Sequence, residues 1–99
     1  MEIEYIEETA KFVGDLTLSD RSIIDRVIEY VEKNGLGVGP KYIKKILNVG
    51  IWELRAGKVR LFLYKKDSFL ICVHAIYKKS QKIKKEDIRL AERRSRLFI

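Results

Sequence analysis

The sequence predicts an α+β domain in which a small antiparallel sheet packs against N-terminal helices and a basic helix closes the C-terminus. We expect the sheet to contain an N-terminal edge strand and a three-stranded meander. Three observations predict this class. Residues 51–77 alternate between apolar and polar positions across two short connections, residues 19–34 carry an apolar stripe at helical spacing, and residues 84–98 repeat that spacing on a basic background. Ninety-nine residues have room for one core, so residues 1–99 are expected to form a single domain.

The N-terminal third predicts a strand followed by two helices. Residues 2–5 alternate Glu with Ile and Tyr, as a short edge strand does. Thr9 is expected to cap a short helix, and Ser19 or Asp20 to cap a longer one that Asn34-Gly35 ends. The apolar stripe of the longer helix consists of Ile23, Ile24, Val27, Ile28 and Val31.

A further helix is predicted after the glycine-rich loop at 35–39. Pro40 suits the first turn of a helix. Ile43, Ile46 and Leu47 would lie on its inner side, and the lysines between them on its outer side.

The meander is predicted over residues 51–56, 59–64 and 69–77. Gly57-Lys58 suits a two-residue type II′ turn because glycine takes the first central position. The second turn is placed at Lys66-Asp67. The C-terminal helix, from Lys84 to Phe98, would turn Ile88, Ala91, Ser95 and Phe98 inward.

This register predicts one apolar face and one mixed face. Trp52 and Leu61 share the apolar face, whereas Arg55 lies directly opposite Arg60 on the mixed face and Arg60 lies opposite Val73. The second hairpin would add Leu70, Cys72 and His74 to the apolar face, and Phe69, Ile71, Val73, Ala75 and Tyr77 to the arginine face. Cys72 and His74 are then expected to be packing residues.

The arginine pair is the first candidate site. Two like charges directly opposite each other repel, and an anion between them would remove that cost. Planar guanidinium groups suit a phosphate, although acids of the N-terminal half could equally neutralise them. Lys79 has the same parity but lies about 20 Å further along an extended strand. It joins the site only if the chain curls back.

The uneven distribution of charge along the chain narrows the classes of function. The chain carries +7, with a net −5 in residues 1–40 and +12 in residues 41–99, so one surface is expected to face a polyanion. A single cysteine excludes an internal disulfide and favours the reducing cytoplasm, and no apolar run is long enough for a membrane span. The lysine run at 78–85 could equally be a solvated loop. Tyr64, Phe69 and Tyr77 could stack on bases or lie under the C-terminal helix.

Several motifs resemble one known family. These are Gly50-Ile-Trp-Glu-Leu-Arg55, Val59-Arg60-Leu-Phe-Leu-Tyr64, His74-Ala-Ile-Tyr-Lys-Lys-Ser-Gln-Lys82 and Glu86-Asp-Ile-Arg-Leu-Ala91-Glu-Arg-Arg94. Together they resemble the RelE/HigB group of bacterial type II toxins, within the RelE/ParE superfamily, and its phage-derived HigB-like branch most of all. The likeness covers residues 48–98 closely and residues 1–47 in element order. Departures include Ile83-Lys84 where many relatives have Thr-Pro, and Glu53 where some have lysine.

The resemblance implies a toxin that cleaves messenger RNA, usually on the ribosome, and that a helix-turn-helix (HigA-like) antitoxin silences. It implies attack by the RNA 2′-OH on the adjacent phosphate, with neither metal nor cofactor. By position, Arg60 and Lys79 match the family's phosphate-contacting and catalytic basic residues, Arg55 ends its Glu-Leu-Arg motif, and Lys78, Gln81 and Lys82 belong to its basic loop. Our catalytic candidates are therefore Arg60, Lys79, Arg55, Lys78 and Tyr77, and our RNA-binding candidates are Lys82, Lys84, Lys85, Gln81 and Lys58. The alternatives are a ParE-like toxin that acts on DNA gyrase and a non-catalytic nucleic-acid-binding module.

Overall fold

The computed structural model describes residues 1–46, 49–80 and 82–99. Its elements, in chain order, are β1 (Glu2–Tyr5), α1 (Glu7–Gly14), α2 (Leu18–Asn34), the 3₁₀ turn η1 (Leu36–Val38), β2 (Ile43–Ile46), β3 (Ile51–Ala56), β4 (Val59–Lys66), β5 (Phe69–Tyr77), α3 (Lys85–Ser95) and the 3₁₀ turn η2 (Arg96–Phe98).

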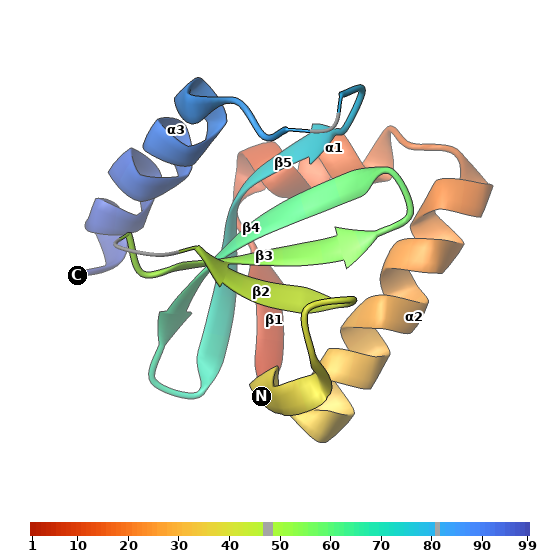
Figure 1. The fold of residues 1–99 in the computed structure, drawn as a ribbon, viewed down its shortest axis with the longest axis horizontal. Coiled ribbons are helices and arrows are strands. Elements are labelled where there is room, and N and C mark those ends of the chain that lie inside the picture. Colours follow the sequence, from red (N-terminus) through yellow and green to blue (C-terminus); the bar gives the residue numbers. More distant parts are fainter. Residues whose placement is uncertain (47–48, 81) are drawn as a thin grey trace.

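The strands form one five-stranded sheet in the order β1-β5-β4-β3-β2, which confirms the α+β class (Figure 1). Strands β3, β4 and β5 form the predicted antiparallel meander. Strand β2, which was not predicted, pairs antiparallel with β3. The edge strand β1 differs, because it runs parallel to β5 with Ile3 opposite Leu70. The sheet is therefore mixed rather than wholly antiparallel.

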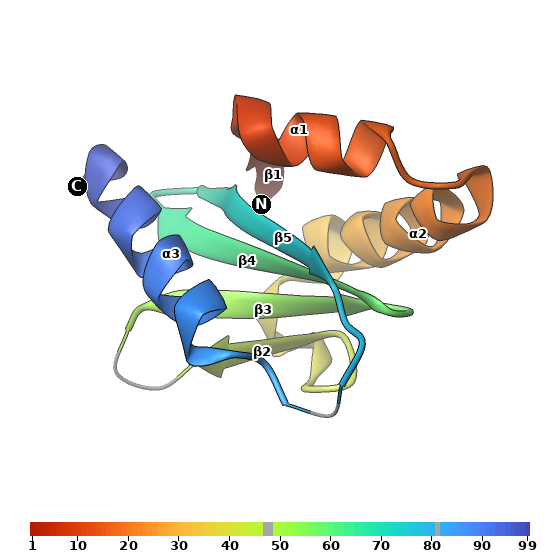
Figure 2. The same ribbon diagram turned by 90° about the horizontal axis from the view of Figure 1, so that it is seen from above.

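Helices cover both faces of the sheet, and each face has its own core. Helices α1 and α2 pack on one face, and α3 crosses part of the other (Figure 2). The larger core joins Ile24 and Val31 of α2 to the sheet, and Trp52 packs half-buried against it. The smaller core packs Ala91 of α3 on Phe62 and on neighbouring strand residues. Ala91 and Ser95 are buried, as the predicted inner side of the C-terminal helix requires.

The helix predicted after Pro40 is wrong over the described residues, because Ile43–Ile46 form strand β2. Ile43 and Ile46 pair with Leu54 and Ile51 of β3. Ile43 is buried in the larger core, while Lys44 and Lys45 remain exposed. The spacing of Ile43 and Ile46 fits a helix, but pairing with the free edge of β3 satisfies the backbone instead. Leu47 lies outside the described residues.

Two helix caps also differ from the predictions. Thr9 lies inside α1, where its Oγ1 donates to the carbonyl oxygens of Ile6 and Cys72 and ties the helix to β5. Thr17 rather than Ser19 or Asp20 caps α2, since its Oγ1 accepts from the amide of Asp20. In the described part of the chain, every helix is too short or too polar to cross a membrane.

The first predicted hairpin is confirmed. Gly57 has a φ of 60° while Lys58 has an ordinary negative φ, as a type II′ turn requires. Arg55 lies opposite Arg60, and Trp52 lies opposite Leu63.

The second hairpin has a different register from the prediction. Its turn is centred on Asp67-Ser68, where Asp67 takes a φ of 55°. A bulge at Val73 then shifts the ladder again, so Arg60 lies opposite Ile76 rather than Val73. The bulge reverses the parity of the end of β5. His74 therefore faces the arginine side, and Ala75 and Tyr77 face away from it.

Candidate functional site

A buried carboxylate lies between the two arginines on the face that α3 only partly covers. Nε of Arg60 lies 3.4 Å from Oε2 of Glu53, and Nε of Arg55 lies 3.7 Å from its Oε1. Glu53 is only 5% exposed, and among the described residues its Oε2 has no hydrogen-bond partner. The repulsion between the guanidinium groups is thus offset from within the same sheet.

This arrangement corrects both sequence-based readings of the arginine pair. The place expected for a phosphate between Arg55 and Arg60 is occupied by the carboxylate of Glu53. The neutralising acid also comes from β3 itself and not from the acidic N-terminal half. Nη1 of Arg55 donates to the carbonyl of Pro40, 3.3 Å away, which holds this side chain toward the loop before β2.

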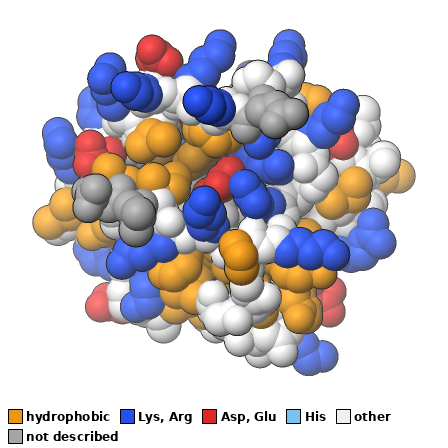
Figure 3. Space-filling view, in the orientation of Figure 1, with side chains coloured by type: hydrophobic (Ala, Val, Ile, Leu, Met, Phe, Trp, Pro, Cys, Tyr) orange, Lys and Arg blue, Asp and Glu red, His pale blue; other side chains and the backbone are white. Residues whose placement is uncertain are grey.

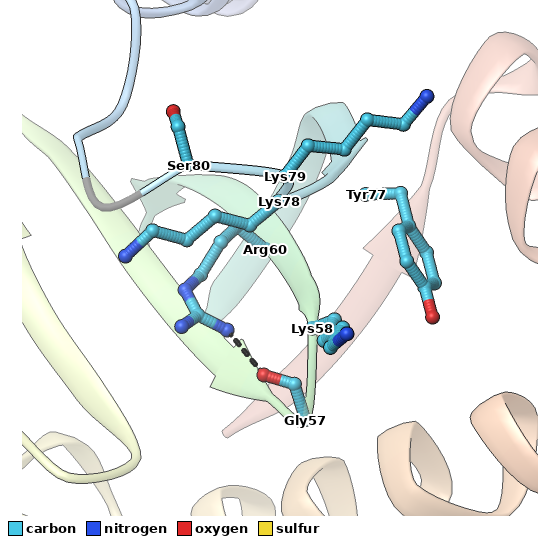
Figure 4. A pocket seen from close by; sticks show the side chains of 7 residues that line it. All are labelled: Gly57, Lys58, Arg60, Tyr77, Lys78, Lys79 and Ser80. Atoms are coloured by element: carbon cyan, nitrogen blue, oxygen red, sulfur yellow. Dashed lines mark hydrogen bonds between the residues drawn. The ribbon is translucent and has the colours of Figure 1, made fainter.

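Arg60 differs from Arg55 because it also lines an open cavity of about 540 Å³. Its Nη1 donates to the carbonyl oxygens of Gly57 at 2.7 Å and of Val59 at 3.0 Å, so the turn itself fixes the guanidinium (Figure 4). Nη2 has no hydrogen-bond partner among the described residues and remains available. Burial, together with the charge of Arg55, lowers the pKa of Arg60 from its ordinary value despite the opposing effect of Glu53.

Three lysines and a tyrosine surround Arg60 in this cavity. It is lined by Gly57, Lys58, Arg60, Tyr77, Lys78, Lys79 and Ser80. Lys78 extends past Arg60 on the same side, whereas Lys79 and Tyr77 point the other way (Figure 4). This follows from the bulge, which places even-numbered residues at the end of β5 on the arginine side. The amide of Lys78 donates to the carbonyl of Lys58, so the ladder continues one residue beyond β5.

A smaller cavity of about 230 Å³ adjoins the same segment and is lined in part by Asp87 of α3. Its lining comprises Ile76, Tyr77, Lys78, Lys79, Ser80, Lys82, Lys84 and Asp87. Residues Tyr77 to Ser80 line both cavities, and we call this segment the ridge. Both hollows carry lysines at their rims.

The structure brings most of the predicted site residues to these two cavities. Arg60, Lys58, Tyr77, Lys78 and Lys79 line the first, and Lys82 and Lys84 line the second. Two predicted site residues line neither cavity. Arg55 turns toward Pro40, and Lys85 begins α3 without lining either cavity. Gln81 lies outside the described residues.

Sequence reasoning missed the pairing of His74 with Asp87. Nε2–H of His74 donates to Oδ1 of Asp87 at 2.8 Å, and the imidazole stacks on Phe62. The prediction placed His74 in the core behind the sheet, but the bulge at Val73 turns it toward α3. The two residues belong to two separate motifs, and nothing in their spacing of 13 residues indicates a contact.

Basic side chains gather on this face of the molecule. Figure 3 shows Lys and Arg side chains around a central hollow in which an acidic side chain is visible. Within the described ranges, no group of three or more His, Cys, Asp or Glu residues is placed to hold a metal ion. The arrangement can bind an anion through one fixed guanidinium group and several mobile ammonium groups.

Comparison with known proteins identifies the family. The family described as Phage derived protein Gp49-like (DUF891) matches residues 11–96, nearly the whole chain. No curated protein matches the chain. The match includes the Arg60 hairpin, the lysine ridge and α3. The chain therefore belongs to the phage-derived Gp49-like family, which is associated with the toxins of toxin–antitoxin systems.

Proposed function

We propose that this protein is a RelE/HigB-type toxin, an endoribonuclease that cleaves messenger RNA, most readily on the ribosome. The observation that carries the proposal is Arg60, whose guanidinium is fixed by the turn at Gly57 and borders a cavity lined by three lysines. The Gly50–Arg94 motifs and the family match support it. The net charge of +12 over residues 41–99 of the chain favours attraction of an RNA backbone.

The proposed reaction uses the RNA's own nucleophile. The 2′-OH attacks the adjacent phosphorus, and the bond to the 5′-oxygen of the next nucleotide breaks. The 2′ proton leaves to a base, and an acid protonates the departing 5′-oxygen. Arg60 would stabilise the negative charge that develops on the phosphorane, because a fixed donor in place before the reaction costs no reorganisation.

Proton transfer falls to the lysines or the tyrosine of the same cavity. Lys78 extends to the side of Arg60 and is the better placed of the two ridge lysines (Figure 4). Its ammonium group can donate a proton to the departing 5′-oxygen. Lys79 and Tyr77 would orient the strand on the other flank of the ridge.

The role of Arg55 in this proposal is indirect. Glu53 stands between the two guanidinium groups, so the phosphate would meet Arg60 and the lysines rather than an arginine pair. Arg55 then helps to balance the buried carboxylate. Lys82 and Lys84, on the rim of the second cavity, would bind neighbouring phosphates of the strand.

The proposed partners follow from the same function. The toxin would act on messenger RNA at the ribosome, in the cytoplasm, and a helix-turn-helix (HigA-like) antitoxin would silence it. The family's association with toxin–antitoxin systems supports a cognate antitoxin.

Primer extension on cellular messages after induction tests the proposal. We expect new 5′ ends at defined codons with the wild-type protein and none with Arg60→Ala. Arg96→Ala is the matched control. It also removes an arginine, but this one lies in η2, is 67% exposed and is far from the ridge in sequence. Intact messages together with arrested gyrase would indicate a ParE-like toxin instead. Intact messages and active gyrase would indicate a non-catalytic binding module.

A further inference from the structure

The smaller cavity, between the ridge and α3, has a chemistry unlike that of the Arg60 cavity. Its volume of about 230 Å³ is below the roughly 300–1,000 Å³ of sites for drug-sized ligands. Ile76 gives it an apolar wall, the lysine stems add further apolar surface, and Asp87 gives it an acceptor. A small cavity with an apolar wall, lysine donors and a carboxylate acceptor suits a flat, partly polar ring.

One wall residue of this cavity lies opposite Arg60 in the sheet. Ile76 of β5 is the cross-strand partner of Arg60 on β4, and directly opposed residues in an antiparallel pair have Cβ atoms about 4.5–5.5 Å apart. A nucleotide attached to a phosphate at Arg60 can therefore reach toward Ile76. The ridge residues Lys78 to Ser80 line both hollows, so a single strand can reach both.

Asp87 is held so that one of its oxygens remains available. Its Oδ1 accepts from Nε2 of His74 at 2.8 Å, and His74 in turn stacks on the buried ring of Phe62. Oδ2 has no hydrogen-bond partner among the described residues, and the side chain is 24% exposed. The carboxylate is thus fixed through one oxygen, and Asp87 is one of the residues that line the cavity.

We propose that this cavity is a base subsite that selects a nucleotide with an exocyclic amino group, cytosine or adenine, next to the phosphate at Arg60. The inference rests on the proposed action on RNA and adds a base preference to it. The Asp87 carboxylate accepts from the amino group, as carboxylates do from N4 of cytosine. Uracil presents a carbonyl oxygen at that position, and two acceptors facing each other repel.

Binding of short RNA oligomers tests the subsite. The probes are fluorescent 2′-O-methyl oligocytidylate and oligouridylate of equal length, which lack the attacking hydroxyl group and so persist uncut. Fluorescence anisotropy gives both dissociation constants for the full-length protein at one low salt concentration. Cytosine and uracil are similar in size, so their affinity ratio isolates the amino group from stacking and charge.

We expect the wild-type protein to bind oligocytidylate about three- to tenfold more tightly, the range of one net hydrogen bond. Asp87→Asn keeps an oxygen for His74 but presents an amide donor to the cavity, so the ratio should fall to one or below. Glu86→Gln removes the neighbouring exposed carboxylate of α3, which lines neither cavity, and should leave the wild-type ratio unchanged.

The outcomes separate this inference from the function on which it rests. Equal wild-type affinities for the two oligomers overturn the subsite but leave RNA binding intact. A wild-type ratio that persists in Asp87→Asn also overturns it, since another group must then read the base. Failure of the wild-type protein to bind either oligomer contradicts both the subsite and the proposed RNA binding.

Discussion

The two faces of the sheet share the same strands but differ in what covers them. On the face under α1 and α2, Leu54, Leu61 and Leu63 are fully buried among aliphatic side chains. On the opposite face, α3 covers Phe62 and Val73 but leaves Arg60 beside an open cavity. Alternate residues of one strand, such as Leu61 and Arg60, therefore serve a core and a candidate site respectively.

The two faces contribute differently to the stability of the fold. The covered face gains from apolar burial, whereas the arginine face holds a carboxylate and two guanidinium groups whose desolvation is costly. An ion cluster at this depth is a poor way to stabilise a sheet. We infer that it persists because it holds Arg60 in place at the cavity.

The largest expected effect on stability comes from the covered face. Leu61→Ala should lower the free energy of unfolding by about 2–5 kcal/mol, because it removes buried methyl groups and leaves a void. Urea unfolding at neutral pH measures this. The control is Leu18→Ala on α2, 73% exposed, which should change the value by less than about 0.5 kcal/mol. Equal losses for the two variants would contradict the assignment of this face as the main core.

A smaller loss with a gain in binding is expected from Glu53→Gln. Neutralising the buried carboxylate should cost about 1–3 kcal/mol of unfolding free energy, because both guanidinium groups lose their counter-charge. The same change should tighten binding of single-stranded RNA, since the face gains one net positive charge.

Urea unfolding and RNA anisotropy measure the two effects of Glu53→Gln. Glu92→Gln is the control, because its carboxylate makes only an exposed 4.0 Å ion pair with Arg96. Unchanged stability in Glu53→Gln would mean that the buried cluster does not hold the face together.

The pH dependence of stability should report on the covered face. Burial raises the pKa of Cys72 from its ordinary value of 9.0 to about 12. Between these values the unfolded thiol ionises and the folded one does not, so stability is full below pH 9 and falls as pH rises toward 12. The slope is about 1.4 kcal/mol per pH unit at most. Burial raises the pKa of Tyr5 too, which adds to the fall in strong alkali.

Urea unfolding of wild type and Cys72→Ala from pH 8 to 10.5 isolates the thiol. The variant should lose stability less steeply above pH 9, whatever its stability at neutral pH. Parallel curves would show that Cys72 is not shielded from water as the structure has it.

The smallest effects on stability belong to the lysines at the rim of the second cavity. Lys82→Ala and Lys84→Ala should each change the unfolding free energy by less than about 0.5 kcal/mol. Each should also reduce the slope of log affinity for single-stranded RNA against log salt by about 0.7, the value for one phosphate contact. Lys33→Ala, on α2, should leave that slope unchanged. If only Lys33→Ala reduced the slope, RNA would bind at α2 and not at the rim of the second cavity, which would contradict the account.

Local chemistry allowed the first hairpin to be predicted from sequence. Gly57 can take the positive φ of a type II′ turn, and that turn fixes which residues of β3 and β4 lie opposite each other. The opposition of Arg55 and Arg60 follows directly. The sequence did not show that Glu53 fills the space between the two arginines. It placed Glu53 on a strand but did not indicate that its carboxylate is buried.

The end of β5 could not be predicted because the bulge at Val73 depends on distant partners. Its carbonyl oxygen accepts from Nη1 of Arg94 on α3 at 2.9 Å, 21 residues later in the chain. No local residue pattern marks such a bulge. It moves His74 to Asp87 and exchanges the directions of Lys78 and Lys79, so the error in register became an error in the site.

Strand β2 shows the same limit at the other edge of the sheet. Pro40 and the spacing of Ile43 and Ile46 are compatible with a helix on local grounds. The amide of Arg55 donates to the carbonyl of Tyr42 at 2.7 Å, so the free edge of β3 draws this segment into the sheet. Tertiary pairing outweighed local preference here.

Growth after induction of Arg60→Ala tests the central claim most directly, with protein levels matched by immunoblot and folding checked by urea unfolding. The account predicts that wild type and Arg96→Ala arrest growth. Arg60→Ala should remain folded, although less stable because buried Glu53 loses a counter-charge, and should not arrest growth. Arrest by well-folded Arg60→Ala at the wild-type level would contradict the claim that this guanidinium, held at the turn of the first hairpin, is where the toxin acts.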